Sequence, residues 1–287
     1  MNKTTLSILL ILILTTLACG VNLGPITRIK TGPTQTEDII VPLPENSETL
    51  TELTLSFGAG SINLEPGAED AIVEGTASYN VEDFDPEVII ENNVVRIEQG
   101  DLNINGIPNF DDDIVNNWDF KLGATPMELT ISAGAYRGKL ELGGLAISDL
   151  DISDGAADVE ISFSQPNLVE MGDFRYSTGA STVELEGLAN ANFDSMAFKS
   201  GAGSYKLDFG GELNRDMNVT IEAGVSSITI IIPEGTSAEV SFEGGLSNIT
   251  TRGAWEQHGS EYVLEGDGPT ISIIVEMGAG NLELRDK

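Results

Sequence analysis

The hydrophobic residues of this chain follow a short unit that recurs along most of its length. Each unit places two large apolar residues five and three positions before a glycine, as Leu53 and Leu55 stand before Gly58. Two more apolar residues usually follow four and six positions after the glycine, as in Ile62-Asn63-Leu64. Because apolar and polar residues alternate with a period of two, the unit predicts strands and not helices.

Eight glycines mark the unit, and a fixed spacing separates most of them. They are Gly58, Gly134, Gly155, Gly179, Gly201, Gly224, Gly245 and Gly278. From Gly134 to Gly245 the successive spacings are 21, 24, 22, 23 and 21 residues, which is typical of a repeat array. We therefore expect an all-β, single-stranded β-helix-like solenoid with about 21–24 residues per coil. The glycines would be structural corners, where a missing side chain allows a sharp bend, a positive φ or a close approach of backbones.

The period fails between Gly58 and Gly134, which are 76 residues apart. Within this interval residues 70–81 alternate as a strand, and residues 87–98 predict a hairpin that turns at Asn92-Asn93. We expect an irregular N-terminal β cap region here, because the end coil of a solenoid needs cover. The predicted boundaries are 48–128 for this region and 129–287 for the solenoid repeats.

A second interruption separates Gly245 from Gly278. It contains a predicted hairpin with His258-Gly259 at its turn. The sequence predicts that residues 281–284 form the last rung of the array. The charged residues 285–287 would then guard an open edge against aggregation.

The N-terminus predicts a secretory leader over residues 1–18. Its apolar stretch, residues 6–17, is too short for a typical spanning helix with flanks. The residues Thr16-Leu17-Ala18-Cys19-Gly20 resemble a bacterial lipoprotein signal, although Thr16 stands where leucine is usual. Cys19 would then be lipidated and would hold the protein on the membrane, facing outward. An ordinary secreted protein is the alternative.

Residues 19–47 contain several prolines and threonines and lack a sustained apolar pattern. They predict a lipid-anchored tether between the membrane and the folded part. In the alternative, part of this segment packs along the solenoid as an edge strand through Ile39-Ile40-Val41.

Several segments of the irregular region carry a family resemblance. They are Tyr79-Asn80-Val81, Pro86-Glu87-Val88, Arg96-Ile97-Glu98-Gln99, Asn117-Trp118-Asp119-Phe120-Lys121-Leu122 and Pro126-Met127-Glu128-Leu129-Thr130-Ile131. Together with the stretch from Gly134 to Ile161, they resemble the toast-rack domain over about residues 50–287. That family includes envelope proteins of bacterial cell-wall stress systems and proteins called putative adhesins. The resemblance implies a β-solenoid outside the cytoplasmic membrane and supplies no catalytic residues.

The charge balance narrows the classes of partner. The formal net charge is −32, and removal of the leader with Lys3 would make it −33. Such a balance argues against nucleic acid and anionic lipid, which require clustered lysine and arginine. It is compatible with cation binding, with a basic protein partner, or with solubility alone.

Motifs for catalysis are few. The chain has one histidine, His258, and one cysteine, Cys19, so a zinc site of the usual Cys/His kind is not expected. Residues 200–204 (Ser-Gly-Ala-Gly-Ser) lack the Gly-Lys-Ser/Thr ending of a phosphate-binding loop. The acidic run 111–113 is either a solvated loop or a calcium ligand set, and it lacks EF-hand spacing. Trp118 and Trp255 are either core aromatics or interaction residues, such as platforms for sugar rings.

The sequence therefore predicts a non-enzymatic envelope protein without cofactor or metal, acting as an adhesin-like or stress-associated binding scaffold. Its partner would be an envelope protein or a polysaccharide. A carbohydrate-active β-helix enzyme (a polysaccharide lyase or hydrolase) and a structural spacer are the alternatives. A functional site is expected where the repeat fails, around residues 101–122 and 246–270.

Overall fold

The computed structural model describes residues 26–44, 49–100, 107–109 and 114–287, and it is built from strands. This confirms the all-β prediction. The elements in chain order are β1 (Ile26–Arg28), β2 (Gln35–Pro42), β3 (Thr51–Ala68), β4 (Ala71–Tyr79), η1 (Glu82–Phe84), β5 (Pro86–Glu91), β6 (Val94–Gln99), β7 (Ile107–Asn109), β8 (Asn116–Gly123), β9 (Met127–Glu141), β10 (Ile147–Ser162), β11 (Met171–Glu186), η2 (Leu188–Ala191), β12 (Phe193–Asp208), β13 (Met217–Ile232), β14 (Ser237–Arg252), β15 (Glu256–His258), β16 (Glu261–Leu264) and β17 (Thr270–Asp286).

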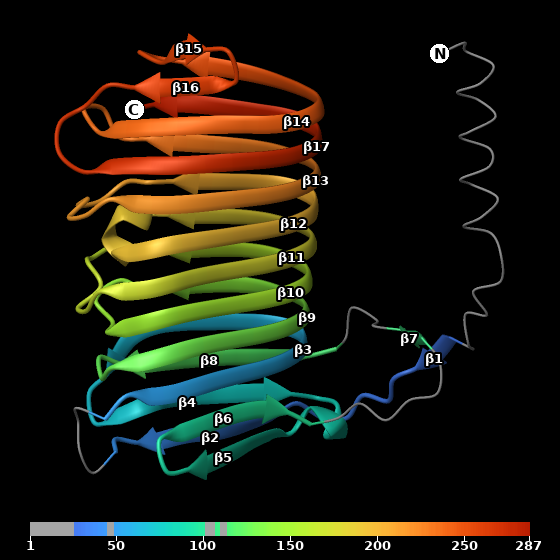
Figure 1. Cartoon of the computed structure of the whole chain (residues 1–287). Coiled ribbons are helices and arrows are strands. Elements are labelled where there is room, and N and C mark those ends of the chain that lie inside the picture. Colours follow the sequence, from blue (N-terminus) through green and yellow to red (C-terminus); the bar gives the residue numbers. More distant parts are fainter. Residues whose placement is uncertain (1–25, 45–48, 101–106, 110–113) are drawn as a thin grey trace.

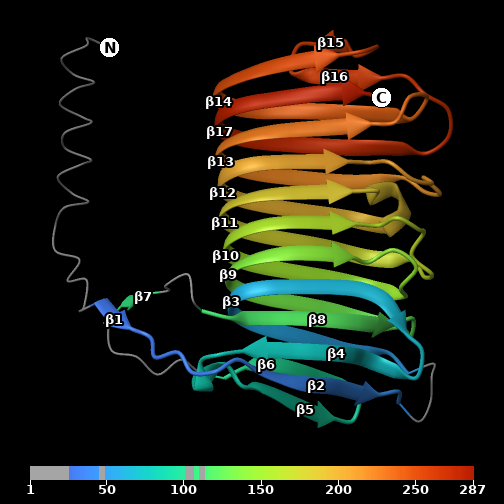
Figure 2. The same cartoon turned by 180° about the vertical axis from the view of Figure 1, so that it is seen from behind.

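Each coil is one long strand bent in its middle, where the predicted corner glycine stands. The half before the glycine forms the first wall of the molecule, and the half after it returns along the second wall (Figures 1 and 2). Loops on the side opposite the corners join one coil to the next. One large hydrophobic core fills the space between the walls, and a second, small cluster of Ile29, Tyr79, Val81 and Phe84 lies in the N-terminal region.

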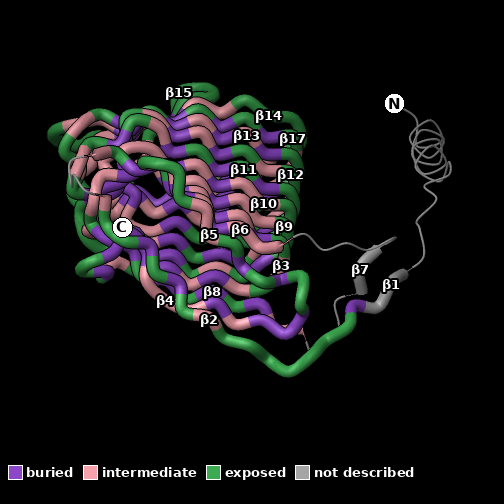
Figure 3. Tube along the Cα trace, turned by 90° about the horizontal axis from the view of Figure 1, so that it is seen from below, coloured by how far each residue is buried: buried purple, intermediate pink, exposed green. Residues whose placement is uncertain are grey.

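The coils stack in parallel with each repeat unit level with its neighbour. Leu150 and Ile152 of β10 lie beside Phe174 and Tyr176 of β11, as the common offset from the glycine requires. All four are buried. Buried and exposed positions therefore alternate along each coil in the same phase from coil to coil (Figure 3).

The long interval between Gly58 and Gly134 interrupts the repeat in the sequence but does not interrupt the stack of coils in space. Strand β3 pairs in parallel with β9 along both walls, so the first unit stacks directly on the regular array. Strands β4, β5, β6 and β8 of this interval form the cap on the other side of β3. There β6 pairs with the first wall of β3 and β8 pairs with its second wall, so together they make a split coil. The predicted hairpin is β5 with β6, and the predicted strand at 70–81 is β4.

The tether prediction for residues 19–47 is wrong over β2. This strand pairs antiparallel with β4 and forms an edge of the sheet. The cause is its period of two, which buries Ile39 and Val41 in the core while Ile40 faces outward, 68% exposed. The alternative of an edge strand through these three residues is the one that the structure bears out. Cys19 and the leader lie outside the described residues.

The predicted last rung is also wrong. Strand β17 pairs in parallel with β13 on one side and with β14 on the other, so the final segment of the chain inserts between two earlier coils. The end coil is β14, and β16 and β15 add antiparallel strands to its first wall. Because every coil offers the same ladder, sequence order does not dictate stacking order. Residues 285–287 therefore do not guard the end of the solenoid.

A candidate binding groove at the glycine corners

The corner glycines form a column in which each one after Gly58 lies against the backbone of the neighbouring corner glycine, and Gly58 lies against the side chain of Gln99. A Cβ atom built on Gly179 would lie 2.3 Å from the carbonyl oxygen of Gly155, and one on Gly201 would lie 2.5 Å from that of Gly179. The column follows spatial order and not sequence order, because Gly278 faces Gly224 and Gly245 faces Gly278. Real Cβ atoms essentially never approach another atom so closely.

Close approach, and not backbone conformation, explains these glycines. None of the eight is among the described glycines with a positive φ. Any side chain at the corner would push two neighbouring coils apart. The next residue is small in most coils, and it is exposed in Ala135, Ala156, Ala180 and Ala202.

A groove runs across the coils beside this column. Its main part has a volume of about 870 Å³ and crosses from β10 to β14. A second part of about 500 Å³ extends it toward Gln99 and Gly100 at the end of β6. Ser153 and Asp154 line both parts, so the groove is continuous along the stacked corners.

The side chains that line the groove change from hydroxyl groups to carboxylates along its length. They belong to the residues two positions before each corner glycine. In spatial order these residues are Ser56, Ser132, Ser153, Ser177, Lys199, Glu222, Glu276 and Glu243. The four serines line one half of the groove, which ends at Lys199. The ammonium group of Lys199 lies 2.9 Å from a carboxylate oxygen of Glu222. The half beyond it carries three successive glutamates on coils that lie about 4.8 Å apart. This end of the groove favours a ligand with positive charge.

A polar cluster centred on Asp154 extends from the groove into the interior of the corners. Tyr176 donates a hydrogen bond of 2.8 Å to the carboxylate of Asp154, and Ser181 donates one of 3.2 Å. The hydroxyl of Thr178 donates to the same carboxylate. Burial, with Asp154 nearby, raises the pKa values of Tyr136 and Tyr176 far above the usual range of tyrosine. These phenols therefore stay protonated, and the hydrogen bonds of the cluster fasten β10 to β11 at the corner.

Neither this cluster nor the groove follows from the period of apolar and polar residues. One signal was present: the residue just before the corner glycine is Asp154 in one coil, whereas the other coils have Phe57, Ala133, Thr178, Ser200, Ala223, Gly244 and Met277 there. A charged residue at an inward position predicts a local polar network, since even a partly buried carboxylate requires donors.

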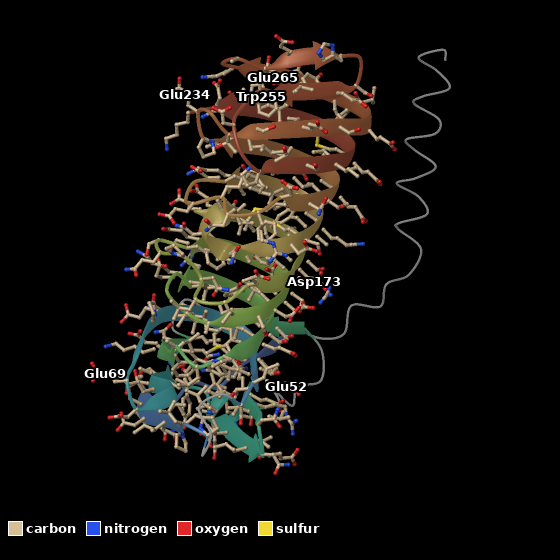
Figure 4. The ribbon with its side chains drawn as sticks, turned by 60° about the vertical axis from the view of Figure 1, so that its left-hand side comes forward. Glu52, Glu69, Asp173, Glu234, Trp255 and Glu265 are labelled. Atoms are coloured by element: carbon tan, nitrogen blue, oxygen red, sulfur yellow. The ribbon has the colours of Figure 1, made fainter. Side chains whose placement is uncertain are left out.

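The predicted interaction residues lie elsewhere. Trp118 of β8 is 1% exposed and packs edge-on against Phe57, so its ring is not available to a surface ligand. Trp255 is half-buried and packs against the core near the end coil, where Figure 4 labels it. His258 is exposed, 3.8 Å from the carboxylate of Glu256.

The predicted acidic run at 111–113 lies outside the described residues. Among those that the structure does describe, no group of three or more His, Cys, Asp or Glu residues could hold a metal ion. No helix in the described part of the chain is long and apolar enough to cross a membrane.

Comparison with known proteins identifies relatives of this fold. A family model described as the N-terminal domain of toast_rack, DUF2154, matches residues 30–172 and 169–231, which is more than half of the chain. No curated protein gives a significant match.

Three solved structures are similar to the chain over most of its length. A putative cell adhesion protein from Clostridium sporogenes has 20% identity and a TM-score of 0.47, with 88% of this chain and 100% of that one covered. A putative lipid binding protein from Parabacteroides distasonis has 15% identity and a TM-score of 0.40, covering 90% and 99%. A putative adhesin from Parabacteroides merdae has 12% identity and a TM-score of 0.38, covering 90% and 98%.

Proposed function

Because the chain belongs to the toast-rack family, we propose that it is a non-enzymatic binding scaffold of the bacterial envelope, anchored by lipid at Cys19. The continuous groove along the stacked corners is the observation that carries this proposal. A groove that crosses successive coils suits an extended ligand, because each coil adds another side chain to the lining about 4.8 Å further along.

The chemistry of the groove narrows the ligand to a polymer with cationic groups. Glu222, Glu276 and Glu243 offer three carboxylates in a row, and only Glu222 is paired with a lysine within the groove. The main part of the groove contains no aromatic ring of the kind that stacks on neutral sugars, and Phe57 in the second part is only 4% exposed. An envelope polysaccharide with free amino groups and a basic protein segment both present such cations.

Substitution of the three glutamates tests this proposal. Wild-type protein should sediment with isolated envelope polymers, and the triple variant with Glu222→Gln, Glu276→Gln and Glu243→Gln should lose most of that binding. Glu69→Gln with Glu234→Gln is the matched control, since both residues are exposed on the side of the connecting loops, away from the corners (Figure 4). Equal binding by the triple variant and the control would remove the groove from the proposal.

Two further measurements test the anchor and the absence of catalysis. Cys19→Ala should release the protein from the membrane fraction, because the acyl chains provide the attachment. Unchanged membrane association would contradict lipidation.

Incubation with envelope and plant polysaccharides should release no reducing ends or unsaturated products. A release that depends on the groove carboxylates would favour the carbohydrate-active enzyme.

A further inference from the structure

The C-terminal end of the solenoid leaves two strand edges open, one in each wall. Strand β14 pairs with β17 along both walls, β16 pairs with its first wall from Ala238 to Ser241, and β15 lies outside β16 (Figure 1). Within the described ranges, no strand pairs with the outer side of β15 or with the outer side of β14 after its corner. We call residues 256–258 the hairpin edge and residues 246–252 the second-wall edge.

The two edges carry opposite charges. Arg252 is the one charged residue of the second-wall edge, and its side chain is 71% exposed. The hairpin edge consists of Glu256, Gln257 and His258, and the side chain of Glu256 is 70% exposed. Because opposite charges stabilise neighbouring strands and like charges destabilise them, each edge fits the other better than it fits a copy of itself.

The second-wall edge also lacks the protection that the edges at the other end of the solenoid have. Strands β2 and β5, which end the sheet there, each contain proline and carboxylates. Residues 246–252 contain neither. Since charges and proline block pairing with another chain, a strand without them is suited to such pairing.

The strand directions allow the two edges to pair. Strand β16 runs antiparallel to the first wall of β14, and β15 runs antiparallel to β16, so β15 follows the direction of the first wall. Each coil turns back at its corner, so the second wall runs the opposite way (Figures 1 and 2). A two-fold axis along the strands, midway between the walls, would exchange the walls of a second copy and leave all strand directions unchanged. The hairpin edge of one copy would then meet the second-wall edge of the other as an antiparallel strand.

The number of strands at the end also selects this axis. Beyond β14 the first wall gains two strands, β16 and β15, and the second wall gains none. With the axis along the strands, each wall of the pair would hold two strands between the end coils. An axis perpendicular to the walls would place four strands in one wall and none in the other. Head-to-tail stacking would place four against three, because the N-terminal end adds β6 and β5 to one wall and β8, β4 and β2 to the other.

The alternation of inward and outward side chains restricts the register of this contact. Gln257 faces inward, because it pairs with Tyr262, which is buried in the core. On the second-wall edge Ile249 and Thr251 face inward, because they lie beside buried leucines of β17. Since a slip of one residue would turn every side chain to the other face, Gln257 of one copy must pair with Ile249 or Thr251 of the other.

Pairing of Gln257 with Thr251 brings the opposite charges together. In an antiparallel ladder it places Glu256 of one copy opposite Arg252 of the other. Pairing with Ile249 would instead place Glu256 opposite the neutral Thr250. The charges therefore favour the first register, and the two-fold axis repeats the pair of Glu256 with Arg252, so that the dimer contains it twice.

The segment that joins the two edges supplies apolar surface at the contact. Residues 253–255 lead from the second wall of β14 to β15, and so they cross the space between the walls. The axis runs through this space, so the crossing segments of the two copies would lie beside each other. Trp255 of this segment is only half-buried against the core. Aromatic side chains near the centre of an interface contribute much of its binding energy.

We propose that the protein forms a two-fold dimer through its C-terminal ends, in which the hairpin edge of each copy pairs with the second-wall edge of the other. The backbone groups of both edges supply the hydrogen bonds, as in strand addition between chains. Because the contact joins one surface to a copy of itself and covers both open edges, the assembly closes at two copies.

Charge reversal at Glu256 and Arg252 tests the contact. Glu256→Arg would place two arginines opposite each other in both copies of the pair, and Arg252→Glu would place two glutamates there. Each variant alone should raise the dissociation constant of the dimer at least about fourfold, since each of the two pairs weakens it at least about twofold. A mixture of the two variants should recover the wild-type affinity, because the mixed dimer has one native pair and one pair with both charges exchanged.

The measurement is sedimentation equilibrium of the full-length protein in density-matched mild detergent under reducing conditions, over a concentration series. Wild-type protein should give monomer and dimer only. Glu160→Arg and Arg137→Glu are the matched controls, because they reverse the same two charges at exposed positions on the central coils β10 and β9. Alone or mixed, the controls should dimerise as the wild type does.

Amide hydrogen exchange of the wild-type protein supplies a second test that needs no variant. Residues 246–252 and 256–258 should exchange more slowly as the dimer forms, whereas β2 should exchange at the same rate at every concentration. Four results would each overturn the proposal: a monomer at every concentration, assemblies larger than dimers, a mixture of Glu256→Arg and Arg252→Glu that associates no better than either variant alone, or a slowing in β2 as large as that in residues 246–252.

Discussion

Substitution of one corner glycine tests why the coils require glycine. In Gly179→Ala the new methyl group would lie 2.3 Å from the carbonyl oxygen of Gly155, whereas ordinary contact begins at 3.4 Å, so 3.4 − 2.3 = 1.1 Å must be opened. Ladder pairs on both sides of the corner resist this movement, Asp154 with Thr178 and Asp158 with Thr182. Overpacking of this kind costs about 1–3 kcal/mol, and alanine regains about 0.4–1 kcal/mol by restricting the unfolded chain.

The expected net loss in the free energy of unfolding is therefore about 1–2 kcal/mol, measured from urea unfolding followed by circular dichroism. Gly155→Ala should cost less than Gly179→Ala, since its Cβ would lie 2.9 Å from the nearest oxygen. Gly32→Ala is the control, because its nearest neighbour would be 3.8 Å away and its φ is not in the left-handed region. If Gly179→Ala is as stable as Gly32→Ala, close approach of the coils is not the reason for glycine.

Three further outcomes follow from the interior. Asp154→Ala should lower the free energy of unfolding by about 2–3 kcal/mol, because three hydroxyl donors lose their acceptor. Asp158→Ala on the exposed face should change it by less than about 0.5 kcal/mol. Similar urea midpoints for the two variants would contradict the hydrogen-bond network around Asp154. Burial raises the pKa values of four tyrosines in the folded state. They are Tyr79, Tyr136, Tyr176 and Tyr205. The contribution of these four tyrosines to stability is then present below about pH 10 and is lost as the pH rises above it. Their tyrosinate absorbance should therefore rise together with the loss of the β-sheet circular dichroism signal, and not gradually while the protein is still folded. Trp118→Ala should cost about 3–5 kcal/mol in urea unfolding and half-buried Trp255→Ala clearly less, whereas equal losses would refute the difference in packing.

The repeat itself could be predicted from sequence because its signal is local. Inward positions such as Leu150 and Ile152 keep a fixed offset from the next glycine, and the two-residue period separates them from outward ones. Element type and corner position follow from these offsets. The hairpin of β5 and β6 followed from equally local turn residues.

The groove could not be predicted, because its lining residues are neighbours only across coils. Lys199 and Glu222 are 23 positions apart in the sequence, and their contact depends on which coil lies next to which. The burial of Trp118 could not be predicted for the same reason. It depends on the pairing of β8 with β3, which completes the split coil. Stacking order must be known before a column of residues can be read across the coils.

The exchanged order of β14 and β17 shows how stacking order changes the chemistry of the end. Had the coils followed the sequence, the open edge would belong to β17, which carries Glu283, Arg285 and Asp286. In the structure that charged coil lies inside the array, where Arg285 and Arg252 hold the pKa of Glu283 below its usual range. The coil left at the end, β14, carries no carboxylate after its corner. The open edge at this end therefore presents neutral side chains and Arg252 in place of the carboxylates of β17, and stacking order, not sequence order, decides this.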